Sequence, residues 1–353
     1  MASLTETAIV SRKAIKYTVL LIIIIVVARL AFKGGVSVYK RLFPPKPPKP
    51  TVSFGKLPSI PFPPKNQPEN LSYSLETTSG RLPEFPQQVE VYFMPPTATN
   101  IQALEQAKHK ASALGFSSEG KLIIENVQNV YLFPKARTPS NLTMNIITGI
   151  FSINYDLRSN PRITEGVPPS PESLEKKAMS LLSKAGYLDT DLKESIVTRK
   201  LLKAEGENFV SVSSLSESNL VKINLFRKNL GSKKDIPSVT PDMPEANVWF
   251  LFAGSKGEII AAEYHHYPRD EKQSSTYPLK TAELAWQELN SGKAYIANLG
   301  ENKSEKIAIR NVHLAYFDAG LYTEYFQPVV VFQGDNDFYA FVPAVTEEYL
   351  AKK

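Results

Sequence analysis

One long apolar run dominates the start of the chain. Residues 17–32 read YTVLLIIIIVVARLAF, and the only charge in them, Arg29, lies near the end. A membrane-spanning helix needs about 20 residues, and extension of the run to Tyr39 supplies that length. We therefore predict a transmembrane anchor over residues 17–39, preceded by a short inner tail, residues 1–16. A cleaved signal peptide is less favoured, because charges rather than a small-residue cleavage site follow the apolar core.

Proline replaces the apolar pattern directly after the anchor. Residues 44–68 contain ten prolines, a composition that favours an extended polyproline II conformation. We predict a proline-rich stalk over residues 40–72, with a proline-motif ligand for a partner module as the alternative. The pattern G-[KR]-L-P-x-[IF]-P occurs at Gly55–Pro61 and again at Gly80–Pro86. We interpret both copies as extended segments that dock their apolar side chains on the surface of a folded domain.

Three amphipathic helices are predicted after the stalk, each followed by a glycine that ends it. The second has the clearest start, with Ser170 as N-cap and Pro171 at the first helical position. The three helices are expected at Asn100–Leu114, Ser170–Ala185 and Lys280–Asn290, and the glycines are Gly115, Gly186 and Gly292.

Runs rich in β-branched and aromatic residues follow each helix and predict strands. They are Thr143–Tyr155, Leu220–Phe226, Val248–Phe252, Glu258–Tyr267, Ile307–Phe317, Tyr325–Phe332 and Phe338–Val342. The segments Gly254–Gly257 and Gly334–Asp337 are typical of hairpin turns. Repeated helix-plus-antiparallel-meander units indicate the α+β class and disfavour a Rossmann-type domain. We place an N-terminal α+β domain at residues 73–167 and a C-terminal one at 168–353.

The last of these units, residues 277–345, carries a resemblance. Its helix contains TAELAW, and strands with the sequences VHLAY, YFQPVVVF and FYAFVP follow. This segment resembles the end of YycH/YycI-type membrane-anchored regulatory proteins and, more loosely, PepSY-type modules. The resemblance implies one anchoring helix, an extracytoplasmic α+β body, and control of a partner sensor kinase.

The same unit allows a detailed prediction of packing. We expect a helix on a three-stranded antiparallel meander, with Leu284, Ala285 and Leu289 facing the sheet. Strict alternation along strand 307–317 would place two sets of side chains on opposite faces. One set is Ile307, Ile309, Asn311, His313, Ala315 and Phe317, and the other is Ala308, Arg310, Val312, Leu314 and Tyr316. Because Pro328 has no amide hydrogen, we expect its strand to lie at an edge or to contain a bulge.

Charge is distributed unevenly and limits the partners. Residues 1–50 contain nine Lys/Arg and one acid, whereas the remaining 303 residues contain 32 Lys/Arg and 34 acids. The positive excess therefore flanks the anchor, where it meets anionic lipid head groups. The predicted soluble part has no basic surplus, which disfavours a nucleic-acid partner. The chain has no cysteine, so disulfides, thiol catalysis and Cys-ligated zinc are excluded.

Candidate chemistry is sparse. Of the four histidines, His109 lies among lysines on a polar helix face and His313 in a strand; the remaining two, His265 and His266, are adjacent, so they point to opposite faces of a strand. Glu263 shares a face with His265, but no third metal ligand is evident.

The remaining acidic and motif patterns give no site either. Asp335 and Asp337 are interpreted as turn residues rather than a calcium loop. No catalytic or nucleotide-binding motif occurs. We therefore predict no catalytic, cofactor-binding or metal-binding residues and no cofactor.

These observations lead to one expectation and its alternatives. We expect a non-enzymatic, membrane-tethered interaction or regulatory protein of the cell envelope. The lipid bilayer and a membrane or envelope protein are its expected partners. We expect a single-pass protein of the cell membrane, with the N-terminus cytoplasmic and the C-terminal domain extracytoplasmic, because all the folded mass follows the anchor. A structural or assembly protein of the envelope is the alternative, followed by an enzyme with an unrecognised site.

Overall fold

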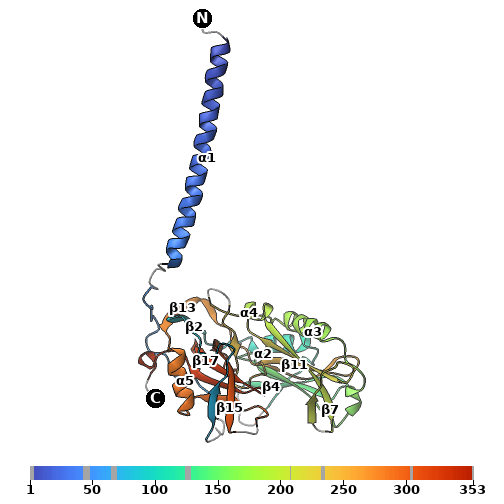
Figure 1. Ribbon diagram of the computed structural model, residues 1–353. Coiled ribbons are helices and arrows are strands. Elements are labelled where there is room, and N and C mark those ends of the chain that lie inside the picture. Colours follow the sequence, from blue (N-terminus) through green and yellow to red (C-terminus); the bar gives the residue numbers. More distant parts are fainter. Residues whose placement is uncertain are drawn as a thin grey trace. The chain divides into compact units, whose positions relative to one another are not determined.

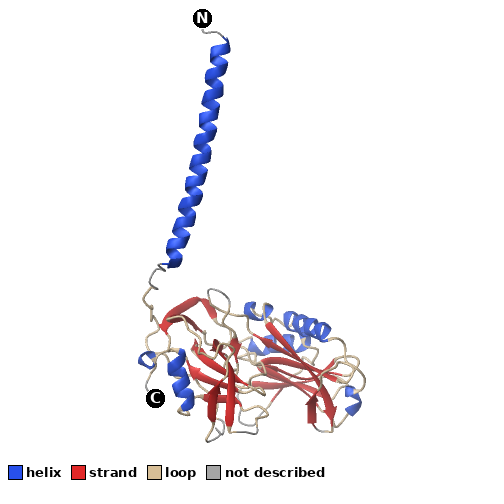
Figure 2. Cartoon of the chain, viewed as in Figure 1, coloured by secondary structure: helices blue, strands red, loops and turns tan. Residues whose placement is uncertain are grey.

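The computed structural model separates the chain into two compact units, Met1–Lys49 and Pro50–Lys353. Figure 1 follows the chain along its length, and Figure 2 shows its helices and strands. The residues described are 4–42, 48–64, 70–123, 129–206, 208–231, 235–302 and 305–351.

The first unit is one helix, α1 (Leu4–Leu42). Its segment Ile15–Gly35 has a mean hydropathy of 2.4 and is, by length and composition, able to cross a membrane. None of this segment is buried inside the protein, so its apolar side chains have no protein core to pack against. The helix runs without interruption through both the expected tail and the expected anchor.

A nine-stranded sheet forms one half of the second unit. Every neighbouring pair in it is antiparallel. In spatial order its strands are β3 (Lys121–Leu122), β4 (Val130–Pro134), β5 (Ser140–Asn145), β6 (Phe151–Tyr155), β12 (Glu258–Tyr264), β11 (Val248–Ala253), β9 (Leu220–Phe226), β7 (Ile196–Glu205) and β8 (Asn208–Ser211). Two helices, α2 (Ala103–Ala113) and α3 (Pro171–Lys184), pack their alanines and leucines into one core with this sheet.

Helix α3 shows why the sequence signals succeed locally. The Ser170 side chain accepts a hydrogen bond from the backbone N–H of Ser173, at 3.3 Å, and Pro171 occupies the first helical position. Gly186 ends the helix with a φ of 69°, a conformation that suits glycine. Between these ends, Leu174 and Leu182 are buried against the sheet, as the apolar spacing predicts.

The other half contains a six-stranded sheet and a three-stranded sheet. The six-stranded sheet has the order β1 (Ser72–Leu75), β15 (Lys306–Phe317), β17 (Pro328–Gly334), β18 (Tyr339–Pro343) and β14 (Tyr295–Asn298), and β10 (Ser238–Val239) also pairs with β15. The three-stranded sheet is β13 (Asp270–Pro278), β2 (Gln88–Phe93) and β16 (Tyr325–Phe326). Helix α5 (Ala282–Asn290) packs on one face of the six-stranded sheet, and Ile60 and Phe62 pack into the core on the opposite face. The α+β class and the antiparallel β15–β17–β18 meander are thus confirmed.

The short helical segments are α4 (Thr190–Lys193) and two 3₁₀ turns, η1 (Pro161–Thr164) and η2 (Glu347–Tyr349). Both predicted hairpin turns are present, since Gly254–Gly257 joins β11 to β12 and the segment after Gln333 joins β17 to β18. The single strand predicted at Thr143–Tyr155 is instead the β5–β6 hairpin.

Two details of the C-terminal unit differ from the sequence prediction. Ala285 and Leu289 are fully buried as expected, but Leu284 is 49% exposed. In β15, the register shifts between Ile309 and Asn311, so that Arg310 is an extra residue opposite β17. This bulge reverses the alternation. Ile307 and Ile309 therefore share a core with the Val312 side of the strand, rather than with Ala315 and Phe317.

The expectation for Pro328 is also wrong, because β17 is a central strand between β15 and β18. Pro328 is its first residue, a position that proline tolerates. The residue opposite it, Tyr316, donates its backbone N–H to Pro237 on the far side of β15. The missing proline N–H is therefore not needed for the pairing with Tyr316.

The division into domains also differs from the one expected. The nine-stranded sheet takes strands from both sides of the boundary drawn between 167 and 168, because β6 pairs with β12. The compact unit begins at Pro50, inside the segment expected to be a stalk. Leu57 in that segment is fully buried. Both copies of the repeated motif pack on the domain, as predicted, since Leu82 and Phe85 of the second copy contact a core cluster.

Candidate functional site

The histidines considered as metal ligands do not form a common site among the described residues. His109 is exposed on α2, and Nε2 of His265 lies 2.9 Å from a carboxylate oxygen of Glu263. No group of three or more potential metal ligands occurs in the part of the chain that the structure describes. Of the pair at 265 and 266, only His266 is buried, consistent with their opposite directions.

The turn residues also behave as predicted. Asn336 and Asp337 have positive φ values of 55° and 61° and form the β17–β18 turn. Asp335 accepts hydrogen bonds from the Arg310 guanidinium at 2.7 to 3.0 Å. Arg310 also contacts Glu76 at 2.8 Å, so this cluster is an exposed ion pair network and not a cation loop.

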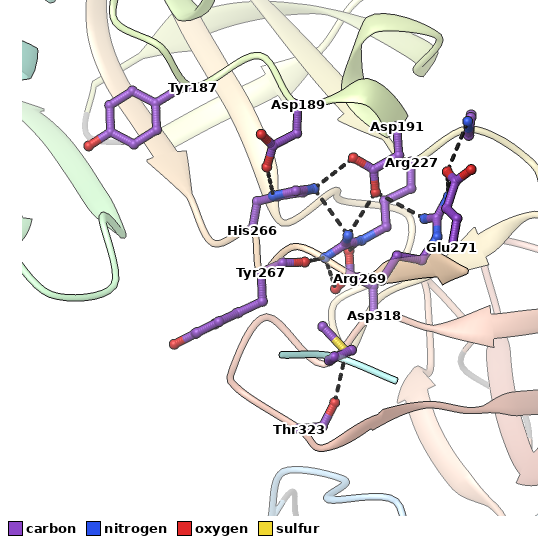
Figure 3. A network of polar contacts seen from close by, with 12 residues as sticks. Tyr187, Asp189, Asp191, Arg227, His266, Tyr267, Arg269, Glu271, Asp318 and Thr323 are labelled. Atoms are coloured by element: carbon purple, nitrogen blue, oxygen red, sulfur yellow. Dashed lines mark hydrogen bonds and ion pairs between the residues drawn. The ribbon is translucent and has the colours of Figure 1, made fainter. Parts of the chain in front are cut away.

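The most prominent polar feature is a mostly buried group of ionisable residues, here called the ionic network (Figure 3). Its members are Asp191, Arg227, His266, Arg269, Glu271 and Asp318. The Arg227 side chain is 1% exposed and lies at the centre. Its Nε donates to Asp318 at 2.7 Å, and one terminal nitrogen donates to Asp191 at 2.8 Å. The other terminal nitrogen donates to the backbone oxygen of Tyr267 at 2.8 Å.

Asp191 collects the remaining contacts. One of its oxygens lies 3.0 Å from Nε2 of His266, and the other accepts from Arg269, also at 3.0 Å. On the opposite edge of the imidazole, Nδ1 of His266 lies 3.3 Å from a carboxylate oxygen of Asp189. Glu271 bonds to Arg269 at 3.0 Å and connects the network to the surface.

Burial opposes the ionisation of Asp191. The hydrogen bond with His266 and the positive charges of Arg227 and Arg269 outweigh that effect and hold the pKa of Asp191 well below its usual range. Burial likewise lowers the pKa of Arg227, but Asp318 and Asp191 raise it more. The ion pair between Asp191 and Arg227 therefore stays charged throughout the physiological pH range.

The placement of these residues suits a structural role. Arg227 follows β9 and His266 follows β12, two strands of the nine-stranded sheet, whereas Asp318 follows β15 of the six-stranded sheet. The network thus connects the ends of strands from both halves of the compact unit. Removal of one partner from such a buried pair leaves the other charge uncompensated, at a cost of about 3–5 kcal/mol. We interpret the network as a clamp between the two halves.

Sequence reasoning missed this network. Its members are distant in the sequence: 127 positions separate Asp191 from Asp318. One signal was available: Arg227 and Asp318 each stand directly after an apolar strand sequence. Opposite charges at the ends of two buried strands are compatible with a salt bridge between sheets, but only the fold shows which ends meet.

A second feature is an open groove of about 720 Å³. One wall is the Pro-Glu-Phe-Pro segment of the second repeat, residues 83–86, continued by residues 88–90 at the start of β2. Val312, His313 and Leu314 of β15 also line the groove. The remaining lining residues are Gly231, Asp235, Ile236 and Thr276. Three carboxylates, of Glu84, Glu90 and Asp235, and no lysine or arginine occur among these described lining residues.

His313 is the one histidine at this groove. Its Nδ1 lies 3.3 Å from the Asn311 side chain, and burial lowers its pKa. The lowered pKa disfavours a positive charge on this ring, and the described lining residues are otherwise acidic, apolar or uncharged.

No family model and no curated protein matches the sequence. Among solved structures, an uncharacterized protein from Eubacterium rectale is similar with a TM-score of 0.41 and 12% identity, over 81% of this chain and 92% of that one. YycH from Bacillus subtilis is similar with a TM-score of 0.34 and 11% identity, over 76% of this chain and 54% of YycH. Both scores are below 0.5, so neither similarity assigns a function.

Proposed function

We propose that this chain is a non-enzymatic, membrane-tethered protein that binds and regulates a membrane partner from outside the cytoplasm. The observation that carries the proposal is the division into one long helix, whose apolar segment Ile15–Gly35 has no buried side chain, and one compact unit from Pro50 onward. A tether of this kind confines a binding domain to the membrane surface, where it meets membrane partners at high effective concentration.

Two further observations support this function. The donors of Arg227, the most buried charged group, are taken by Asp191, Asp318 and a backbone carbonyl, which favours a structural role over catalysis. The sequence of residues 277–345 resembles YycH/YycI-type regulators, and that resemblance points to a sensor kinase as the regulated partner.

The test of this function is cross-linking in the chain's own membranes. The full chain is cross-linked in intact cells, and cross-linked membrane proteins are identified by mass spectrometry. We expect a sensor kinase or another signalling membrane protein to be enriched, and its output to change when the gene is deleted. The matched control replaces Ile15–Gly35 by an unrelated spanning helix and shows whether α1 or the compact unit makes the contact.

Two results would contradict the proposal. One is full regulation of the partner by residues 50–353 released as a soluble protein, because the tether would then have no role. The other is protection of residues 50–353 from external protease in intact cells, together with digestion in inverted vesicles, because the compact unit would then be cytoplasmic.

A further inference from the structure

Strand β15 has a gap along one of its edges. On one side, β17 pairs with it from Ile309 to Tyr316. On the other side, β1 pairs in parallel with Lys306–Ile309 and β10 pairs in parallel with Tyr316–Phe317. In the described residues, no strand pairs with residues 310–315 on that second side. We call this stretch the β15 gap.

The backbone of the gap offers hydrogen-bonding groups to an added strand. Tyr316 donates its backbone N–H to Pro237 and Asp318 donates to Val239, both at 2.8 Å and both on the β10 side. Phe317 donates in the opposite direction, to Gln327, at 3.0 Å. Because these directions alternate along a strand, the N–H and C=O groups of Val312 and Leu314 face the β10 side as well.

The β15 gap coincides with the open groove. Val312, His313 and Leu314 line both, and the groove is open to solvent with a volume of about 720 Å³. Six residues of strand span about 20 Å, so a short extended peptide fits between the end of β1 and the start of β10. Residues 83–86 and Ile236 line the same groove.

The groove also indicates the chemistry of its occupant. The partly buried side chains of Phe85 and Ile236 offer apolar contacts, and Glu84, Glu90 and Asp235 offer negative charge. Alternate side chains of a strand point to opposite sides. An extended peptide with alternating apolar and basic side chains can therefore meet the apolar residues and the carboxylates of the groove at the same time. Main-chain hydrogen bonds would supply affinity, and the side-chain pockets specificity, as in other strand-addition sites.

We propose that the β15 gap binds an extended, basic and apolar segment of the partner protein as an added strand between β1 and β10. This rests on the proposed function, because it takes the gap as the place where the tethered unit holds its partner. The two proposals fail separately, since the cross-linking above identifies a partner by any surface, whereas the following test concerns the gap alone.

The test uses the full chain in detergent micelles and defined peptides. The probe is an acetylated, amidated hexapeptide of alternating valine and lysine, and the comparison peptide has glutamate in place of lysine. Two further probes carry N-methyl groups, either on all three valines or on all three lysines, which removes the N–H donors of one edge at a time. Binding is measured by calorimetry, and amide hydrogen exchange is followed at Val312 and Leu314.

We expect the lysine peptide to bind at least tenfold more tightly than the glutamate peptide and to slow exchange at Val312 and Leu314. One of the two N-methylated peptides should lose at least tenfold in affinity, and the other should lose much less. Glu84→Gln should weaken the lysine peptide by at least threefold. Glu283→Gln, an exposed carboxylate on α5 outside the groove, is the matched control and should not change binding.

Three outcomes would overturn the proposal. They are no binding of the lysine peptide at 1 mM, equal binding of both N-methylated peptides, and slowed exchange only outside residues 310–315. Concentration-dependent self-association that protects Val312 and Leu314 without peptide would also overturn it, because the occupant would then be a second copy of this chain.

Discussion

The two copies of the repeated motif, Gly55–Pro61 and Gly80–Pro86, have the same local structure and different surroundings. In each, the glycine N–H donates to the residue three positions earlier, from Gly55 to Val52 at 3.1 Å and from Gly80 to Thr77 at 2.9 Å. Both glycines have positive φ, 69° and 64°. The shared glycine therefore ends a turn in both places, because glycine suits the fourth position of such turns, although the three residues before it differ between the copies.

The leucines that follow these turns differ. Leu57 is fully buried, donates its backbone N–H to Tyr349 at 2.8 Å and accepts from Ala351 at 2.8 Å. Leu82 is half-buried, and the residues directly after it line the open groove. The first copy also pairs with a segment of the same chain near the C-terminus, whereas the second packs Leu82 and Phe85 on a core cluster and borders the open groove. The first copy of the motif is thus enclosed by another segment of the chain, whereas the second copy lines a groove that is open to solvent.

Removal of the first copy should have the largest effect. A fragment that starts at Leu71 lacks Leu57 and also Phe62, whose ring stacks on Tyr295 with centroids 4.7 Å apart. Burial losses of this kind cost about 2–5 kcal/mol for each large side chain. We expect this fragment to be less stable than one starting at Pro50 by at least about 5 kcal/mol, measured by urea unfolding. Equal urea midpoints for the two fragments would show that the folded domain starts near residue 71, as the proline content predicts.

Truncation of single leucines should sharpen the contrast between the copies. In the fragment starting at Pro50, Leu57→Ala should lower the free energy of unfolding by about 2–5 kcal/mol, because the site is fully enclosed. Leu82→Ala should lower it by about 1 kcal/mol, as is usual for a partly buried position. The measurement is the urea midpoint at unchanged slope. A larger loss for Leu82→Ala would show that the second copy is the more tightly docked of the two.

The contrast also shows how far the sequence determines the molecule. Helix starts and ends, hairpin turns and the docking of both motif copies follow from local signals such as Ser170, Gly186 and the Gly-Lys/Arg-Leu-Pro pattern. The bulge at Arg310 does not, because it depends on register against β17. The ionic network does not either, because Asp191, Arg227 and Asp318 meet only when two sheets pack. The sequence does not predict which distant segments pair with one another. The β15 gap could not be predicted for the same reason.

Substitution of the two glycines should give the smallest difference between the two copies. A Cβ at Gly55 or Gly80 would meet no atom within 4 Å, so crowding contributes nothing at either site. The cost that remains is the positive φ, about 1–2 kcal/mol for a residue with a side chain. Gly55→Ala and Gly80→Ala should therefore lower the free energy of unfolding by equal amounts, within about 0.5 kcal/mol, in matched urea titrations. The two glycines share a backbone conformation, whereas the leucines after them differ in burial. A large difference between the two glycine substitutions would therefore mean that the turns depend on their surroundings.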